Sequence, residues 1–319
     1  MIEITVENKD SNQRFDKFLK KHLPNATTSF LYKMLRKKNI TLNGKKATGN
    51  EKLIEQDKIA FFFSDETYEK FRGDEKLAVD ELELLKKLPM HGLSIVYEDD
   101  DILIANKPYN MLSQKAKPSD VSANEYLLGY LIRNSVVTSA SFRSFRPSVC
   151  NRLDRNTTGL ILMGKTLHGS QMLSEALKER TVQKFYYAIV KGTVEEEAVH
   201  RGYLIKNEKT NQVQIVSKPS EDAVYIETGY KPISYTKEAT LLEVHLITGK
   251  THQIRAHLAS LGHPILGDPK YGDMRFNEKY KNEFHIHHQL LHAYRVKFTD
   301  GREFVAKLPK EMEQVLQNR

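Results

Sequence analysis

The stretch "CNRLDRNTTGLILMGKT", residues 150–166, places one acid, Asp154, between Arg152 and Arg155 and just ahead of a Thr-Thr-Gly corner. The apolar run 159–164 that follows predicts a buried strand. Asp154 is therefore expected in the loop just before that strand, where a rigid scaffold commonly holds functional groups. Two interpretations remain open at this point. The carboxylate either forms an ion pair at a strand end or is kept ionised so that it can attack a substrate.

Length and composition limit the class of protein. The chain has 319 residues, of which 39% are hydrophobic and 28% charged, and this predicts a globular protein of two domains. A single cysteine, Cys150, excludes an internal disulfide framework and a cysteine-built zinc site. No apolar run approaches the ~18 residues of a membrane span. The N-terminus lacks a signal-peptide pattern, so we expect a cytoplasmic protein without a membrane partner.

The net charge of +8 is unevenly distributed along the chain. Residues 1–63 carry 13 Lys and Arg against 7 Asp and Glu, whereas residues 64–90 carry 5 against 8. We therefore predict a basic domain at 1–63, a polar linker at 64–90 with at most one or two helical turns, and a second basic domain at 91–319. Two basic domains suit a polyanionic partner.

The first domain combines helices with a hairpin. Apolar residues recur at helical spacing before Pro24 and again after the candidate caps Thr27, Thr28 and Ser29. An Asn-Gly pair at 43–44 within "ITLNGKKAT" predicts a β-hairpin. Cations gather at the end of the second helix and at the hairpin, and a compact positive face of this kind suits phosphate groups. The candidate contacts are Arg36, Lys37, Lys38 and Lys45.

The second domain contains many strands and few helices. In "KFYYAIVKG", residues 184–192, Tyr186, Ala188 and Val190 are expected on one face of a strand and the residues between them on the other. "THQIRAHLASLGHP" predicts a helix that stops near Gly262 and Pro264, and two further strands are expected around Asp300-Gly301. The predicted fold class is α+β. It has a mixed, largely antiparallel catalytic sheet with flanking helices and a small N-terminal α/β domain.

Three motifs, "NRLDRNTTGLIL", "KFYYAIVKG" and "TGKTHQIRAHLASLGHPILGDPKYG", resemble the RluA-type pseudouridine synthases in order and separation. The resemblance covers about residues 91–300, and the N-terminal stretch resembles the S4 RNA-binding module. It implies an RNA-modifying isomerase with Asp154 as the catalytic carboxylate, Tyr186 as an active-site tyrosine and Arg255 as the partner of Asp154. By the same resemblance, Arg152 is expected to fill the space that the flipped-out base vacates.

The chemistry of the reaction agrees with these residue types. Isomerising uridine breaks the base–sugar C–N bond and joins C5 of the base to the sugar, without redox change or group donor, so no cofactor is expected. An adjacent arginine lowers the pKa of a carboxyl and favours the anion. Tyr186 offers a flat apolar face and a hydroxyl that could assist proton removal at C5. Lys107, in "NKP", is either a phosphate contact or a solvated lysine.

Several alternatives remain open. Ribosomal RNA is the preferred substrate, with transfer RNA as the alternative; no obligate protein partner is expected, and the protein is expected to be a monomer. A rival hypothesis is an inactive synthase-like protein that binds RNA in ribosome assembly. Another is a glycoside or nucleoside hydrolase, which would use a second carboxyl group, but Asp268 is the only further acid in the motifs and is expected in a loop turn.

A metal site is not expected. The histidine-rich stretch "HIHHQLLHA" contains neither a carboxylate nor a cysteine to complete a ligand set. Departures from the usual family pattern at Asn110, Asn151, Lys250 and His288 leave the proposed catalytic groups in place. They leave the subfamily, and with it the uridine modified, undetermined.

Overall fold

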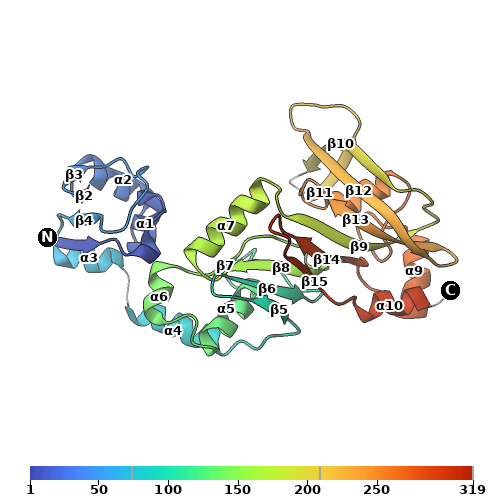
Figure 1. Cartoon of the computed structure of the whole chain (residues 1–319), viewed down its shortest axis with the longest axis horizontal. Helices are drawn as coiled ribbons and strands as arrows, with labels where there is room; N and C mark the ends of the chain where they lie inside the picture. The colour runs from blue at the N-terminus through green and yellow to red at the C-terminus, as the bar shows by residue number, and fades with distance from the viewer. Residues whose placement is uncertain (73–74, 208–209, 318–319) are drawn as a thin grey trace.

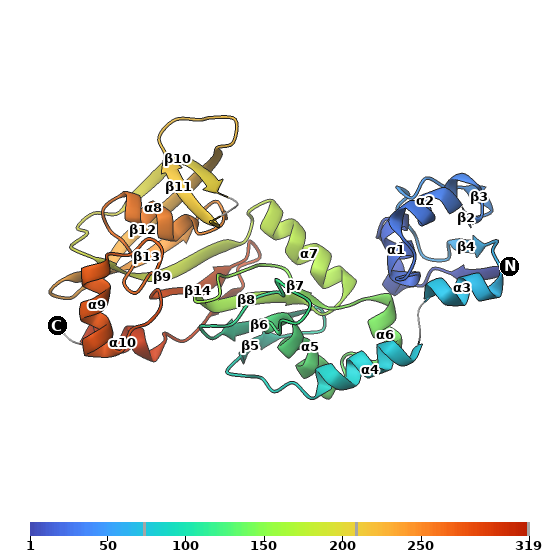
Figure 2. The ribbon, with the colours of Figure 1, turned by 180° about the vertical axis from the view of Figure 1, so that it is seen from behind.

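The computed structural model describes residues 1–72, 75–207 and 210–317. Two separate sheets organise the chain: one of four strands near the N-terminus and one of eleven strands in the remainder. Figures 1 and 2 show an elongated molecule with the N-terminal unit at one end, beyond α6 (Ser139–Ser144), and α9 (Met274–Phe284) with α10 (Lys310–Gln317) at the other. None of the described helices is long and apolar enough to cross a membrane.

The N-terminal unit packs helices against its small antiparallel sheet, whose strand order is β1-β4-β2-β3. At the tip of the β2–β3 hairpin, Asn43 and Gly44 both have positive φ, 50° and 71°, which is the backbone of the tight turn that Asn-Gly predicts. The side chain of Thr27 accepts a hydrogen bond from the backbone N–H of Phe30 and so caps the second helix. The elements are β1 (Ile2–Thr5), a 3-10 turn (Asn8–Asp10), α1 (Phe15–His22), α2 (Thr28–Arg36), β2 (Ile40–Leu42), β3 (Lys45–Lys46), β4 (Lys58–Phe61) and α3 (Asp65–Arg72).

The segment 64–90, predicted as a polar linker with at most one or two helical turns, contains more helix than expected. In α3, Tyr68 is buried in the core of the N-terminal unit beside Phe61. In α4 (Glu75–Lys86), Leu82 and Leu85 are buried in the core of the larger unit. Among the side chains that the structure describes, few apolar positions in these two helices are buried, and such a sparse pattern gives a weak hydrophobic period.

The larger unit contains the remaining elements, with helices beside a long sheet (Figure 1). Its first half consists of β5 (Ser94–Glu98), β6 (Ile102–Lys107), α5 (Ala123–Arg133), α6, β7 (Ser148–Val149), β8 (Thr158–Gly164) and α7 (Leu167–Lys178). Its second half consists of β9 (Gln183–Lys191), β10 (Ala198–Asn207), β11 (Gln212–Val216), β12 (Val224–Tyr235), β13 (Ala239–Leu246), α8 (Gln253–Ser260), α9, β14 (Leu291–Lys297), β15 (Glu303–Val305) and α10.

The large sheet confirms the α+β, largely antiparallel prediction. Its main path is β11-β10-β12-β13-β9-β14-β8-β6-β5, and β8 with β14 is the parallel pair among the described strands. At that pair Gly159 has φ +111°, and a Cβ there would lie 2.2 Å from the carbonyl oxygen of Ala293. Only glycine fits this corner, which explains the Thr-Thr-Gly sequence that follows Asp154.

Strand β9 separates two parts of the core, as its alternation predicts. Tyr186, Ala188 and Val190 are buried in the cluster that also contains Leu153, whereas Ile189 lies in a second cluster with α9 and α10. The sequence reading missed β10, α6, α9 and α10. Helices α9 and α10 lie in polar segments before and after β14. Each of these segments carries only a short apolar stripe at helical spacing.

Candidate active site

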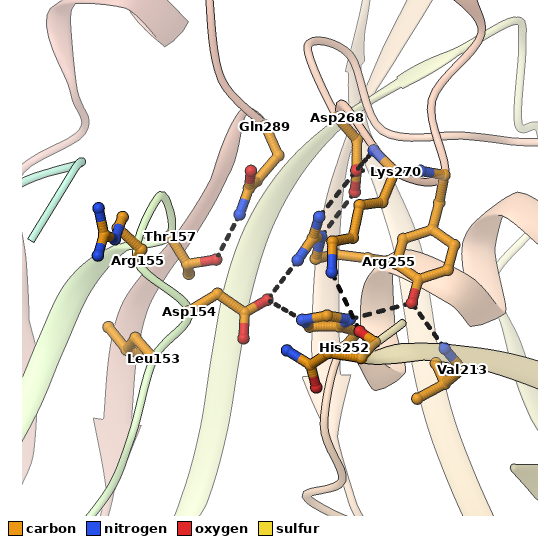
Figure 3. A network of polar contacts seen from close by, with 12 residues as sticks. Leu153, Asp154, Arg155, Thr157, Val213, His252, Arg255, Asp268, Lys270 and Gln289 are labelled. Atoms are coloured by element: carbon orange, nitrogen blue, oxygen red, sulfur yellow. Dashed lines mark hydrogen bonds and ion pairs between the residues drawn. The ribbon is translucent and has the colours of Figure 1, made fainter. Parts of the chain in front are cut away.

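Asp154 lies in the loop between β7 and β8, as predicted (Figure 3). The backbone on either side of it is fixed by local hydrogen bonds. The hydroxyl of Ser113 donates to the carbonyl of Leu153 (2.9 Å) and accepts from the N–H of the same residue (3.0 Å). The N–H of Thr157 donates to the carbonyl of Asp154 at 3.1 Å and closes the turn. The carboxylate therefore projects from a backbone with little freedom to move.

Lys107 also fixes this loop. Its side chain is fully buried, and its ammonium donates to the carbonyl oxygens of Pro108 (3.0 Å), Met111 (2.9 Å) and Arg155 (3.1 Å). Burial lowers the pKa of Lys107 to about 7, against an opposing effect of the Asp154 charge. Neither expectation for Lys107, a phosphate contact or a solvated lysine, agrees with this geometry, because carbonyls occupy all three directions of its ammonium and the side chain is buried.

The ion pair of Asp154 is made with Arg255, not with the flanking arginines. Nη1 of Arg255 donates to Oδ2 of Asp154 at 2.7 Å, while Arg152 and Arg155 are exposed and form no ion pair with any described residue. In Figure 3 the Arg155 side chain points away from the carboxylate. The partner thus comes from α8, 101 positions along the chain.

Arg255 is itself fixed by Asp268. Nε and Nη2 of the guanidinium donate to the two oxygens of Asp268, at 2.7 and 2.8 Å. Asp268 has a fully buried side chain and also accepts from the N–H groups of Lys270 (2.8 Å) and Tyr271 (3.1 Å). Burial opposes the charge on Arg255, but the hydrogen bonds and charge of Asp268, then those of Asp154, raise its pKa above the usual value. The guanidinium is therefore a permanent cation in a fixed orientation.

One oxygen of Asp154 is left for chemistry. Oδ2 contacts Arg255, whereas Oδ1 accepts no hydrogen bond from the described part of the chain, and the side chain is 28% exposed. An ionised carboxylate with one oxygen fixed and the other accessible can act as a nucleophile or as a base.

His252 is a second neighbour of Asp154, at the start of α8 with a left-handed φ of 51°. Its Nε2 lies 3.9 Å from Oδ2 of Asp154, and its Nδ1 lies 3.0 Å from the hydroxyl of Tyr271. That hydroxyl also accepts from the N–H of Val213 at 2.9 Å. Burial lowers the pKa of His252. The lowered pKa favours the neutral ring beside the carboxylate.

Tyr186 lies on β9 with only 6% of its surface exposed. Burial, and then the negative charge of Asp154, raise the pKa of its phenol above the ordinary value. The phenol is therefore neutral at physiological pH. Its hydroxyl forms no hydrogen bond with the described residues, which leaves the proton available to a bound molecule.

The sequence reading missed three residues of the site: Asp268, His252 and Tyr271. The sequence predicts a loop turn at Asp268 and no role in the site, although the Gly/Pro-rich loop directly after the Arg255 helix is a usable signal. The burial of this acid follows from its contact with Arg255 and could not be seen in the sequence.

The predicted phosphate contacts Arg36, Lys37, Lys38 and Lys45 are exposed. Among the residues that the structure describes, no group of three or more His, Cys, Asp or Glu could hold a metal.

Comparison with known proteins agrees with this geometry. Residues 101–260 match the family model of the RNA pseudouridylate synthases. Ribosomal large subunit pseudouridine synthase C of Vibrio cholerae is 32% identical over 98% of this chain and 95% of its own length. An uncharacterized RNA pseudouridine synthase of Mycoplasma genitalium is 32% identical over 92% of this chain and 88% of its own.

A solved structure supports the fold. Human RNA pseudouridylate synthase domain containing 4 matches with a TM-score of 0.57 at 24% identity, covering 75% of this chain and 97% of the human chain. The family model spans half of the sequence, and the relatives match nearly all of it. The chain therefore belongs to the RNA pseudouridylate synthase family.

Proposed function

We propose that this protein isomerises specific uridines of large-subunit ribosomal RNA to pseudouridine, with Asp154 as the catalytic carboxylate. The observation that carries the proposal is the fixed chain Asp154–Arg255–Asp268, which leaves Oδ1 of Asp154 accessible. Relatives from several bacteria that match this chain over nearly its whole length are named ribosomal large subunit pseudouridine synthases.

In the proposed reaction the N1–C1′ bond breaks, the uracil turns, and C5 bonds to C1′ while the C5 proton leaves and N1 gains a proton. Attack by Asp154 on the sugar or the base, or removal of a sugar proton, each require the ionised form. The Arg255 guanidinium stabilises that form because it is a permanent cation 2.7 Å away. No redox step or group donor takes part, so no cofactor is included in the proposal.

Tyr186 is proposed to face the uracil. Its neutral phenol offers an apolar ring and a hydroxyl that no described residue occupies, so it can stack on the base and assist proton transfer at C5. Exposed Arg152, two residues before Asp154, is proposed to enter the space that the flipped-out base leaves.

The N-terminal unit is proposed to act as an S4-like module that binds structured RNA. Arg36, Lys37 and Lys38 follow one another at the end of α2, and Lys45 lies on the neighbouring hairpin. All four are exposed, and none forms an ion pair within the described residues, so their charges are free to neutralise phosphates. The proposal includes a monomeric enzyme acting in the cytoplasm.

The test is tritium release from large-subunit ribosomal RNA, transcribed without modifications and labelled at C5 of uridine. We expect release by wild type and by Asp300→Asn, a control in an exposed turn, but none by the isosteric Asp154→Asn. RNA binding by all three proteins is followed by filter retention.

Three results would contradict the proposal. Release by Asp154→Asn at the wild-type rate would remove Asp154 from the mechanism. If wild type releases tritium from transfer RNA but not from ribosomal RNA, the substrate assignment is wrong. Tight binding of both RNAs without release from either would favour the inactive RNA-binding protein.

A further inference from the structure

Tyr109 is an exposed tyrosine beside the proposed catalytic loop. It lies in the turn between Lys107 and Met111, and 49% of its surface is exposed. One face of its ring lies parallel to the ring of His288, with centroids 4.2 Å apart and an angle of 6° between the planes. The ring is thus fixed flat against a neighbour, although half of it faces solvent.

His288 is a rigid support for this stack. The residue is only 7% exposed, and burial lowers its pKa, so the ring is uncharged. Its backbone lies against Gly267, where a Cβ would be 2.1 Å from the carbonyl oxygen of His288. The buried ring of His288 therefore keeps its orientation. The ring of Tyr109, stacked on it, is held in the same orientation.

Both segments that carry the two rings are bound to the loop that contains Asp154. On the Tyr109 side, the N–H of Met111 donates to the carbonyl of Arg155 at 3.1 Å, and the Lys107 ammonium contacts the same carbonyl. On the His288 side, the neighbouring Gln289 donates from Nε2 to the hydroxyl of Thr157 at 3.2 Å (Figure 3). The stack therefore belongs to the surroundings of the catalytic loop.

Two other exposed tyrosines provide a contrast. Tyr225 and Tyr235 are 40% and 46% exposed, but the hydroxyl of Tyr225 donates to Glu227 and that of Tyr235 to the carbonyl of Val194. Within the described residues, the Tyr109 hydroxyl has no such partner. The ring of Tyr109 is fixed by stacking alone, which leaves its outer face for a second planar group.

The geometry points to Tyr109 as a stacking platform for an unpaired RNA base close to the target uridine. Nucleobases stack on aromatic rings with little dependence on sequence. The exposed side chain of Arg155, in the adjoining loop, supplies positive charge for the phosphates of the same strand. The inference rests on the RNA substrate of the proposed function, but not on the role of Asp154.

The absence of tryptophan from the chain permits a direct test. Tyr109→Trp introduces a single fluorescent reporter, and Tyr235→Trp, at the far end of β12, is its matched control. We expect substrate ribosomal RNA to quench the indole emission of Tyr109→Trp but not that of Tyr235→Trp. Heparin, a polyanion without bases, should leave the emission of both variants unchanged. Unchanged emission from Tyr109→Trp at saturating RNA would overturn the inference, as would equal quenching by heparin.

A second set of variants separates stacking from hydrogen bonding. Tyr109→Phe retains the ring and should keep wild-type affinity, whereas Tyr109→Ala should raise the KM for RNA by ~10-fold, with a smaller change in kcat. Tyr235→Ala is the control. Equal effects of Phe and Ala at 109 would overturn the inference.

The two proposals fail in different ways. Tritium release by wild type, together with unquenched emission from Tyr109→Trp, would contradict the platform alone. Quenched emission from Tyr109→Trp, when neither this variant nor wild type releases tritium, would contradict the proposed function alone.

Discussion

Cations serve opposite purposes in the two units of this protein. At the end of α2, Arg36, Lys37 and Lys38 are exposed and form no ion pair within the described part of the chain. Beside Asp154, Lys107 and Arg255 are buried, and each donates three hydrogen bonds to oxygens of the protein. A buried cation of this kind fixes a loop or a carboxylate, whereas an exposed one remains available to a ligand. Removing the first kind should therefore affect folding, and removing the second kind should affect RNA binding.

The largest effect is expected at Arg255. Arg255→Leu leaves Asp268 fully buried without its partner, so the free energy of unfolding should fall by about 3–5 kcal/mol. Denaturation by urea measures the change, and Arg255→Lys, which retains the charge, should lose less. A loss below about 1 kcal/mol would show that Asp268 does not depend on this cation. Turnover by Arg255→Leu can be interpreted only after this measurement.

A buried histidine in the larger unit should make that unit sensitive to acid. His292 has no exposed surface, and burial lowers its pKa from 6.5 to about 4. Between these two pH values the unfolded chain binds a proton that the folded protein does not. Stability is therefore lost as pH falls from 6.5 to 4, by about 2–3 kcal/mol for this residue.

Urea denaturation at about pH 7 and about pH 4.5 checks this prediction by comparing wild type with His292→Asn, because most of the titration lies between these two pH values. The amide of asparagine matches the position of Nδ1, which lies 2.7 Å from the hydroxyl of Thr158, but it does not titrate. The same acid-dependent loss in both proteins would contradict a contribution from His292.

A smaller effect on folding is expected at Lys107. Lys107→Met leaves the carbonyls of Pro108, Met111 and Arg155 without their donor, and the free energy of unfolding should fall by about 1–3 kcal/mol. Tritium release should also decline, because the loop of Asp154 loses a fixed point, while RNA affinity stays close to wild type. A loss of RNA affinity would instead support the hypothesis that Lys107 contacts a phosphate, which the structure argues against.

The smallest effect on folding is expected for the exposed cations. Reversing Arg36, Lys37 and Lys38 to Glu should change the free energy of unfolding by less than about 0.5 kcal/mol. RNA binding should weaken, and the slope of log K against log salt should become shallower by roughly 0.7–0.9 per lost phosphate contact. The control reverses Lys17, Lys58 and Lys70, which changes the net charge equally. Identical salt slopes for the two triple variants would exclude α2 as a specific contact.

The sequence predicted the parts of this molecule that depend on neighbouring residues. The Asn-Gly turn, the strand after Asp154 and the two faces of β9 all follow from local pattern, and the structure confirms them. The full extent of helices α3 and α4 did not show in the sequence, because their described buried residues are divided between two different cores. The fully buried states of Lys107 and Asp268 depend on partners brought close by the fold, which no local pattern reports.

The pairing of Asp154 with Arg255 also has a consequence for synthesis. The two residues are 101 positions apart, and β14, near the end of the chain, lies between β8 and β9 in the sheet. A nascent chain that has emerged only as far as β9 contains the carboxylate but not Arg255, Asp268 or the strand that completes the sheet. Contacts of such long sequence separation form late in folding. A chain that has emerged only as far as β9 therefore cannot yet form the Asp154–Arg255–Asp268 contacts or complete the large sheet.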